Sequence, residues 1–246
     1  MFDLDDTLAE SFKPPSISMV EKLSTLLEHV PVAISTAAGF TRIEKDFLSR
    51  MQKSAHIDRM YILANSSAEC FTWTGGAWNL EYDFALTDEE KETIQQAIIE
   101  GVVETGIQEG QTKYEPMVID RGAQIAYAAI GLEATAEDKA AWDPDQAKRR
   151  KLKSAIDAKL ANFEVLIGGK TTIDITRKGI HKAYGVGWLS ERLKIAPSEM
   201  LYIGDALYEG GNDEVVIPTG IQTIQTSGPA ETETIVEELC RICRPA

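Results

Sequence analysis

The chain has 246 residues, of which 43% are hydrophobic and 26% are charged, and its formal net charge at neutral pH is −14. The length fits one large or two small domains, and the composition is ordinary for a globular protein. An acidic balance of this size argues against nucleic acid or an anionic membrane as a partner, because both require a basic surface.

No apolar run approaches ~20 residues, so the sequence predicts no transmembrane helix. The N-terminus shows no basic region followed by an apolar stretch, which argues against a signal peptide and favours the cytoplasm. The three cysteines are Cys70, Cys240 and Cys243. The last two form a single C-x-x-C pair, whereas a zinc site usually needs four ligands, so we expect reduced, half-buried thiols.

The first residues, Phe2-Asp3-Leu4-Asp5-Asp6-Thr7-Leu8, place carboxylates at the end of a short apolar run. Because side chains alternate along a strand, Asp3 and Asp5 can share one face at its tip and meet one ligand. Two acids held close together repel each other unless a cation lies between them, which suits a divalent metal and an anionic substrate. The alternative is that Asp5, Asp6 and Thr7 are turn and capping residues.

The next segments predict a parallel sheet with crossover helices. Apolar residues at helical spacing indicate a helix over about 16–28, and a strand follows at 32–34. A second helix over about 41–52 leads to a strand at 60–64. This order of strand, helix, strand, helix and strand is typical of parallel pairing. A further strand-like stretch, 70–73, and two glycines after it indicate a small hairpin.

Between about 84 and 176 the pattern becomes that of an inserted α+β domain. Thr87 with Glu90 three residues later forms a capping box, which opens a helix to about 104. A strand, a helix and a hairpin are expected after it, at 124–130, about 143–160 and 163–175. The core then resumes with a helix from 181, a strand at 201–203, a second strand at 222–225 and a final helix from 230. We therefore predict a core domain of residues 1–83 and 177–246, and an inserted domain of residues 84–176.

Four segments, in the right order, resemble the motifs of the haloacid dehalogenase (HAD) superfamily. They are the D-x-D-x-T pattern that begins at Asp3, a Ser or Thr after the second strand, a Lys that opens a late helix, and the acidic cluster within 201–213. The resemblance implies an α/β fold, with a Rossmann-like parallel sheet core and an inserted cap. Only Met1 and Phe2 precede Asp3, fewer than is usual for the first strand of this fold, so we expect a chain that starts here to be less stable.

The inserted α+β domain resembles the type IIB cap of Cof-like sugar-phosphate phosphatases, sucrose-phosphate phosphatases and eukaryotic-type phosphomannomutases. The segments 121–131, 168–174 and 210–213 are most similar to the phosphomannomutase branch. However, Leu132 and Lys139 stand where phosphomannomutases carry arginine, and lysine cannot grip phosphate bidentately. A mutase must bind phosphate at both ends of its substrate, so we expect hydrolysis, with a mutase reaction as the alternative.

The resemblance implies Mg²⁺-dependent phosphoryl transfer from a small sugar phosphate. Mg²⁺ prefers oxygen ligands and bridges carboxylate and phosphate well. Asp3 would be the nucleophile that forms an aspartyl-phosphate, and Asp5 the general acid and then the base. Asp205 would hold the metal together with Asp3 and the backbone carbonyl of Asp5, and Asp213 would orient the metal shell.

Two of the motifs offer competing residues. For the second motif we favour Thr36 over Ser35, because small residues follow Thr36 as the family pattern requires. For the third motif we favour Lys182 over Lys178, because the family places the lysine three residues after a glycine, here Gly179. Thr36 and Lys182 would hold the phosphoryl oxygens and offset the charge that develops there.

In the inserted domain we expect Arg121, Lys139, Thr172 and Asp174 to recognise the substrate; the alternative is that they are surface and hairpin residues. By resemblance, Arg121 and Lys139 would face the distal phosphate or the sugar, and Asp174 would accept hydrogen bonds from sugar hydroxyls. The resembling mutases also imply a homodimer through the cap. Two other classes of protein are alternatives: an inactive phospho-ligand-binding protein and a signalling receiver module. The inserted domain argues against the receiver module.

Overall fold

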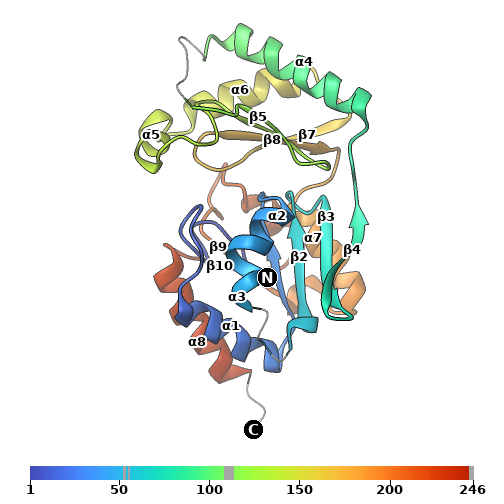
Figure 1. The fold of residues 1–246 in the computed structure, drawn as a ribbon, viewed down its shortest axis with the longest axis vertical. Helices are drawn as coiled ribbons and strands as arrows, with labels where there is room; N and C mark the ends of the chain where they lie inside the picture. The colour runs from blue at the N-terminus through green and yellow to red at the C-terminus, as the bar shows by residue number, and fades with distance from the viewer. Residues whose placement is uncertain (52–53, 55, 108–113, 244–246) are drawn as a thin grey trace. The chain divides into compact units, whose positions relative to one another are not determined.

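The computed structural model describes residues 1–51, 54, 56–107 and 114–243. The chain divides into two compact units, one made of Met1–Asp83 with His181–Ala246 and the other of Phe84–Ile180 (Figure 1). The first unit, here called the core unit, is an α/β structure, and the second, the inserted unit, is α+β. The inserted unit runs to Ile180, whose carbonyl accepts a hydrogen bond from the Thr176 hydroxyl at 2.5 Å.

The N-terminal segment lies in the middle of the core sheet. Phe2 bridges in parallel to Ile34 on one side and to Ile203 on the other, which joins two ladders into one sheet. The sheet order is β10, β9, the N-terminal segment, β1, β2, β3 and β4; the β2–β3 and β3–β4 pairs are antiparallel and the other pairs are parallel. Its strands are β1 (Val32–Ser35), β2 (Met60–Ala64), β3 (Glu69–Thr74), β4 (Ala77–Asp83), β9 (Leu201–Gly204) and β10 (Gln222–Gln225).

Hydrophobic clusters lie on both faces of this sheet. Ile34 belongs to the cluster that includes residues of α1 and α8, and its neighbour Ala33 belongs to the cluster that includes residues of α7. The alternation of strand side chains thus gives both faces apolar residues, as expected for a parallel sheet covered on both sides. The main helices are α1 (Ile17–His29), α7 (Lys182–Leu193) and α8 (Pro229–Ile242).

The helix predicted over about 41–52 is divided into three short pieces. α2 (Phe40–Ile43) is followed by a π-helical turn (Glu44–Leu48) and by α3 (Ser49–Met51), and the predicted end at Gln52 lies outside the described residues. Its buried residues still include Phe47 and Leu48. The hydrophobic spacing therefore located the helix, whereas the local widening of the turn had no signal in the sequence.

The inserted unit contains an antiparallel sheet in the order β5, β6, β8 and β7. Its strands are β5 (Val118–Asp120), β6 (Ile125–Ala128), β7 (Phe163–Ile167) and β8 (Thr172–Arg177), and its helices are α4 (Asp88–Thr105), α5 (Ala136–Trp142) and α6 (Ala147–Asp157). The predicted capping box is present, because the Thr87 hydroxyl accepts from the Glu90 N–H and the Glu90 carboxylate accepts from the Thr87 N–H. β5 and α5 were not predicted from the sequence.

Two further features bear on function. Within the part of the chain that the structure describes, no helix is both long enough and apolar enough to cross a membrane. The three cysteines are free thiols, and burial raises the pKa of Cys70 to about 12. A thiol with so high a pKa is a poor nucleophile at neutral pH, so Cys70 is a packing residue.

Candidate active site

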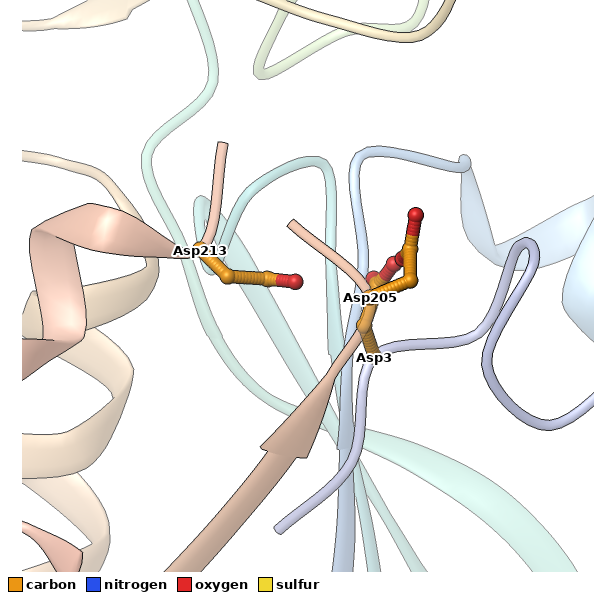
Figure 2. Close-up of side chains that lie close together, drawn as sticks. All are labelled: Asp3, Asp205 and Asp213. Atoms are coloured by element: carbon orange, nitrogen blue, oxygen red, sulfur yellow. The ribbon is translucent and has the colours of Figure 1, made fainter. Parts of the chain in front are cut away.

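Three carboxylates meet at the C-terminal ends of the parallel strands. Asp3 ends the N-terminal segment, Asp205 follows β9, and Asp213 lies in the next loop. One oxygen from each lies within 4.8 Å of the other two. Figure 2 shows the Asp213 side chain extending toward the pair formed by Asp3 and Asp205. Side chains so far apart in the chain meet because parallel strands end at one edge of the sheet, where open α/β sheets bind ligands.

Lys182 neutralises part of this negative charge. Its Nζ lies 2.7 Å from Asp3 Oδ1 and 2.7 Å from Asp213 Oδ1, and its side chain is 2% exposed. Lys182 is the first residue of α7, so its ammonium is fixed by the start of that helix. Lys178, the competing lysine, is exposed in the inserted unit and pairs with Glu164 at 3.5 Å. Of the two lysines, the structure therefore brings Lys182 to the carboxylates.

The buried charges change one another's pKa. Burial, together with Asp213 and Asp205, raises the pKa of Asp3 well above its usual range, although Lys182 opposes this. Burial and the nearby Asp213 also raise the pKa of Asp205 to about 6, and again Lys182 opposes the rise. Burial disfavours the Lys182 ammonium, but the two carboxylates that it contacts outweigh burial and raise its pKa. The cluster thus has more negative charge than one ammonium can offset, which favours binding of a cation.

Asp213 is held from several sides. Its Oδ1 accepts from the Tyr202 hydroxyl at 2.6 Å, and its Oδ2 accepts from the Ala206 N–H at 3.2 Å. Asp213 also packs directly over Gly204, where an added Cβ would lie only 2.3 Å from Asp213 Oδ2. Glycine is therefore required at position 204 by this close approach and not by an unusual backbone angle. Tyr202 was not predicted from the sequence, because its pattern there is that of one more apolar residue of the strand.

Thr7 fixes Asp205 in a similar way. The Thr7 hydroxyl accepts from the Asp205 N–H at 3.0 Å and donates to Asp205 Oδ1 at 3.1 Å, and Thr7 is fully buried. Between Asp3 and Thr7 the chain turns sharply, with Asp6 in the left-handed region at φ 58°. Thr7 is the last residue of the predicted D-x-D-x-T pattern, with a turn or capping role as the alternative, and the structure gives it a specific contact with the acidic cluster.

Asp5 lies apart from the other acids. The group of mutually close carboxylate oxygens contains Asp3, Asp205 and Asp213, but not the side chain of Asp5. Both Asp5 oxygens instead accept from the Arg42 guanidinium, with Oδ2 at 2.8 Å from Nη1. Asp5 is expected to bind the metal through its backbone carbonyl, and this remains a prediction.

Ser35 and Thr36 are both buried at the end of β1. The Ser35 hydroxyl lies 3.2 Å from the Ser67 hydroxyl, so it is engaged with the turn between β2 and β3. The Thr36 hydroxyl accepts from the Ala38 N–H at 3.1 Å and belongs to the loop that leaves the strand. The loop position agrees with the family pattern for a phosphate ligand, and our preference for Thr36 remains a prediction.

The residues expected to recognise substrate lie on several elements of the inserted unit. Arg121 Nη1 is 4.0 Å from Asp174 Oδ1, and an added Cβ at Gly168 would lie 2.2 Å from Thr172 Oγ1 and 2.3 Å from Asp174 Oδ2. Thr172 and Asp174 therefore lie against Gly168, and Arg121 faces Asp174. Lys139 lies on α5, where its Nζ donates to the Leu132 carbonyl at 2.7 Å.

The donor set of the acidic cluster fits a hard divalent ion. Every close ligand atom is a carboxylate oxygen, which Mg²⁺ and Ca²⁺ prefer, and no sulfur or imidazole lies in the group. The raised pKa of Asp3 and the rise of the pKa of Asp205 to about 6 both indicate negative charge that lacks full compensation. These residues can therefore hold a divalent metal beside the Asp3 carboxylate.

Comparisons with known proteins agree with this geometry. Residues 124–213 match a family model described as haloacid dehalogenase-like hydrolase. A phosphomannomutase of Spinacia oleracea is 22% identical over 218 residues, which cover 87% of this chain and 83% of that protein. An IMP-bound, N-terminally truncated IMP-nucleotidase of Plasmodium falciparum is similar in structure, with a TM-score of 0.70, 18% identity and coverage of 98% of this chain and 67% of that one. A haloacid dehalogenase-like hydrolase of Bacteroides thetaiotaomicron gives a TM-score of 0.61, with 18% identity and coverage of 98% and 97%.

Proposed function

We propose that this chain, which belongs to the haloacid dehalogenase superfamily and carries a type IIB cap, is a Mg²⁺-dependent phosphatase of small sugar phosphates. The observation that carries the proposal is the buried group of Asp3, Lys182, Asp205 and Asp213 at the ends of the parallel strands. It combines a nucleophilic carboxylate, a fixed ammonium and an oxygen site for a divalent ion. Such a set suits transfer of a phosphoryl group to a carboxylate.

In the first step, an Asp3 oxygen attacks the phosphorus of the bound ester and the bond to the leaving oxygen breaks. Asp5 gives a proton to that oxygen, so the alcohol leaves as a neutral molecule and an aspartyl-phosphate remains on Asp3. In the second step, Asp5 takes a proton from water, which attacks the same phosphorus and releases inorganic phosphate. Asp3 and Asp5 then return to their starting states, so atoms and protons balance over the cycle.

Electrostatic stabilisation is the task of the other residues. The Lys182 ammonium, already 2.7 Å from Asp3 Oδ1, lies where it can bind a phosphoryl oxygen as charge spreads onto it, and Thr36 supplies a hydroxyl for another. Asp205 and Asp213 would hold the metal, and Thr7 and Tyr202 keep these two carboxylates in place. When bound, Mg²⁺ screens the repulsion between the Asp3 carboxylate and the phosphate dianion.

Substrate choice belongs to the inserted unit in this proposal. Arg121, Thr172 and Asp174 supply a cation, a hydroxyl and a carboxylate in one polar group, which suits a sugar with several hydroxyls and a negative charge. Lys139 is proposed to assist from α5. The homodimer through the inserted unit and the cytoplasmic location also remain predictions.

A phosphomannomutase-like reaction is the second candidate. It is favoured by the sequence match to a phosphomannomutase over 87% of this chain. The chemistry at Asp3 would be shared, and only the acceptor of the phosphoryl group would differ, a sugar hydroxyl in place of water. Against it stand Leu132 and Lys139, which lack the guanidinium groups that would grip a second phosphate.

Product analysis separates these candidates. Mannose 1-phosphate and Mg²⁺ are incubated with the protein, with and without glucose 1,6-bisphosphate, and Asp3→Asn is the control. Free phosphate without the bisphosphate, and none from the variant, supports the phosphatase. Mannose 6-phosphate that forms only with the bisphosphate supports the mutase. If neither product appears and a wider panel of phosphate esters is also untouched, the enzyme proposal is wrong and a phospho-ligand-binding protein is the better reading.

A further inference from the structure

Arg42 is the cationic residue that contacts Asp5. Its Nη1 lies 2.8 Å from Asp5 Oδ2, and its Nη2 donates to Asp5 Oδ1, so the guanidinium binds both oxygens of the carboxylate. The Phe12 N–H adds a third, longer bond of 3.3 Å to Oδ1. A bidentate pair of this kind fixes the plane of the carboxylate as well as its position. Asp5 thus has one defined direction in the core unit.

Arg42 is itself held by its surroundings. It lies on α2, and the ring centroid of Phe12 is 4.4 Å from the guanidinium carbon. Asp46 Oδ2 approaches the guanidinium Nε at 3.9 Å. Phe12 adopts φ 61°, a left-handed conformation that is uncommon for a bulky residue, and it is 52% exposed. The loop after Asp5 therefore folds back so that its aromatic ring covers the guanidinium.

This contact joins two loops that both belong to the candidate site. Asp5 follows Asp3 in the N-terminal loop, and α2 follows the loop of Thr36 after β1. Arg42 bridges these loops without touching the cluster of Asp3, Asp205 and Asp213. Both partners of the pair are partly exposed, with side chains 24% and 28% exposed. Partly exposed ion pairs contribute little to stability, so the consequence of this pair lies in the geometry that it imposes on Asp5.

We propose that Arg42 is a positioning residue for Asp5, and that transfer of a proton to the leaving oxygen depends on it. This inference rests on the proposed phosphatase function. Among the residues that the structure describes, Arg42 is the hydrogen-bond donor to Asp5 Oδ2, so without the guanidinium the carboxylate can rotate about its Cβ–Cγ bond. A proton donor with several orientations spends less time within hydrogen-bond reach of the leaving oxygen, which lowers the rate of that step.

Two phosphate esters with different leaving groups provide the test. The nitrophenolate of 4-nitrophenyl phosphate leaves without a proton at neutral pH, whereas the alkoxide of benzyl phosphate needs one. We compare kcat/KM, because it covers only the steps up to departure of the first leaving group and not the later attack of water. The variants are Arg42→Gln and Arg42→Lys, and Arg50→Gln is the matched control, because Arg50 is an exposed arginine farther along the same helical segment.

We expect Arg42→Gln to lower kcat/KM for benzyl phosphate by about 10- to 100-fold, within the range of general acid catalysis. For 4-nitrophenyl phosphate we expect a loss of less than about threefold, and Arg42→Lys should lie between wild type and Arg42→Gln for the benzyl ester. In an Asp5→Asn background, Arg42→Gln should cause no further loss, because the residue on which it acts is already disabled. Mn²⁺ affinity should stay unchanged, because the substitution acts on the Asp5 side chain, which lies outside the acidic cluster.

Equal losses on the two esters, or additive losses in the double variant, would overturn the inference and leave the phosphatase proposal intact. Such results would mean that Arg42 only supports the fold of the site. A wild-type protein that hydrolyses neither ester with Mg²⁺ would contradict the proposed function itself, and the inference would fall with it.

Discussion

Lys182 and Asp213 form an ion pair 2.7 Å long between two side chains that are almost completely buried, at 2% and 0% exposure. The same ammonium contacts Asp3 at the same distance. Burial of one cation between two anions stabilises the fold only while all three members are present, because the removal of one leaves an uncompensated charge in a medium of low dielectric. The catalytic arrangement and the stability of the core unit are therefore coupled.

Replacement of Lys182 by methionine should destabilise the protein and abolish phosphoryl transfer. Because Asp3 and Asp213 would then face each other without a cation, we expect a loss of about 3–5 kcal/mol in the free energy of unfolding without metal. Urea denaturation in EDTA and in Mg²⁺ measures this. Mg²⁺ should stabilise the variant by more than it stabilises the wild type, because it restores positive charge between the carboxylates. Equal stabilisation of both proteins would argue that the ion does not bind at these carboxylates.

Gly204→Ala should weaken metal binding. A Cβ at this position would lie 2.3 Å from Asp213 Oδ2, so Asp213 must move away from Asp3 and Asp205. We expect at least a tenfold loss of Mn²⁺ affinity, as for other residues that orient metal ligands, where losses are about 10- to 100-fold. The matched control is Gly187→Ala, an exposed helical position with nothing within 4 Å of the added Cβ. That control should leave metal binding unchanged and stabilise α7 by up to about 1 kcal/mol.

The metal-free protein should show a pH dependence that depends on Asp205. Burial and Asp213 raise the pKa of Asp205 to about 6, above the value of about 4 expected in the unfolded chain. Between these values the folded state binds more protons than the unfolded state, so this residue lowers stability as pH rises from about 4 to 6. The unfolding free energy of Asp205→Asn, relative to wild type, should therefore increase over this window. A constant difference between the two proteins would contradict the assigned environment of Asp205.

Asp174→Asn should change the use of sugar phosphates and leave 4-nitrophenyl phosphate unaffected. The substitution keeps the shape of a buried residue but removes the charge that faces Arg121 at 4.0 Å. We expect an increase in KM for the best sugar phosphate of about tenfold, consistent with the loss of one hydrogen bond to a charged group. Steady-state kinetics with the sugar phosphate and with 4-nitrophenyl phosphate measure the change in KM. A parallel loss on both would indicate that Asp174 supports the fold and does not select the substrate.

Much of the fold could be predicted from the sequence because its signals are local. Strand 60–64, strand 222–225 and the capping box at Thr87 all agree with the structure, because each depends on residues close together in the chain. The elements that were not predicted are those without a strong local pattern. β5 has only three residues, and α5 buries none of its side chains, so neither shows a hydrophobic periodicity.

The site was predictable only in part, for a physical reason. The three clustered aspartates and Lys182 could be predicted, because metal-assisted phosphoryl transfer restricts which residue types can serve at the ends of the strands. Tyr202 and Arg42 could not, because their roles come from contacts with residues 11 and 37 positions away in the chain. Thr7 belongs to the D-x-D-x-T pattern, but its contact with Asp205, 198 residues away, has no signal in the sequence. A tyrosine in a buried strand and an arginine on a short helix have no pattern that sets them apart from ordinary residues.

The most direct test of the central claim is to trap the phosphorylated residue. The protein is mixed with Mg²⁺ and a phosphate ester that it hydrolyses, and the reaction is quenched during turnover. Borohydride is then added, because it reduces an acyl phosphate to an alcohol. Peptide mass spectrometry then locates the modification. The account predicts conversion of Asp3 to homoserine, and no conversion when substrate is omitted. Turnover accompanied by an unmodified Asp3, or by modification of another residue, would contradict it.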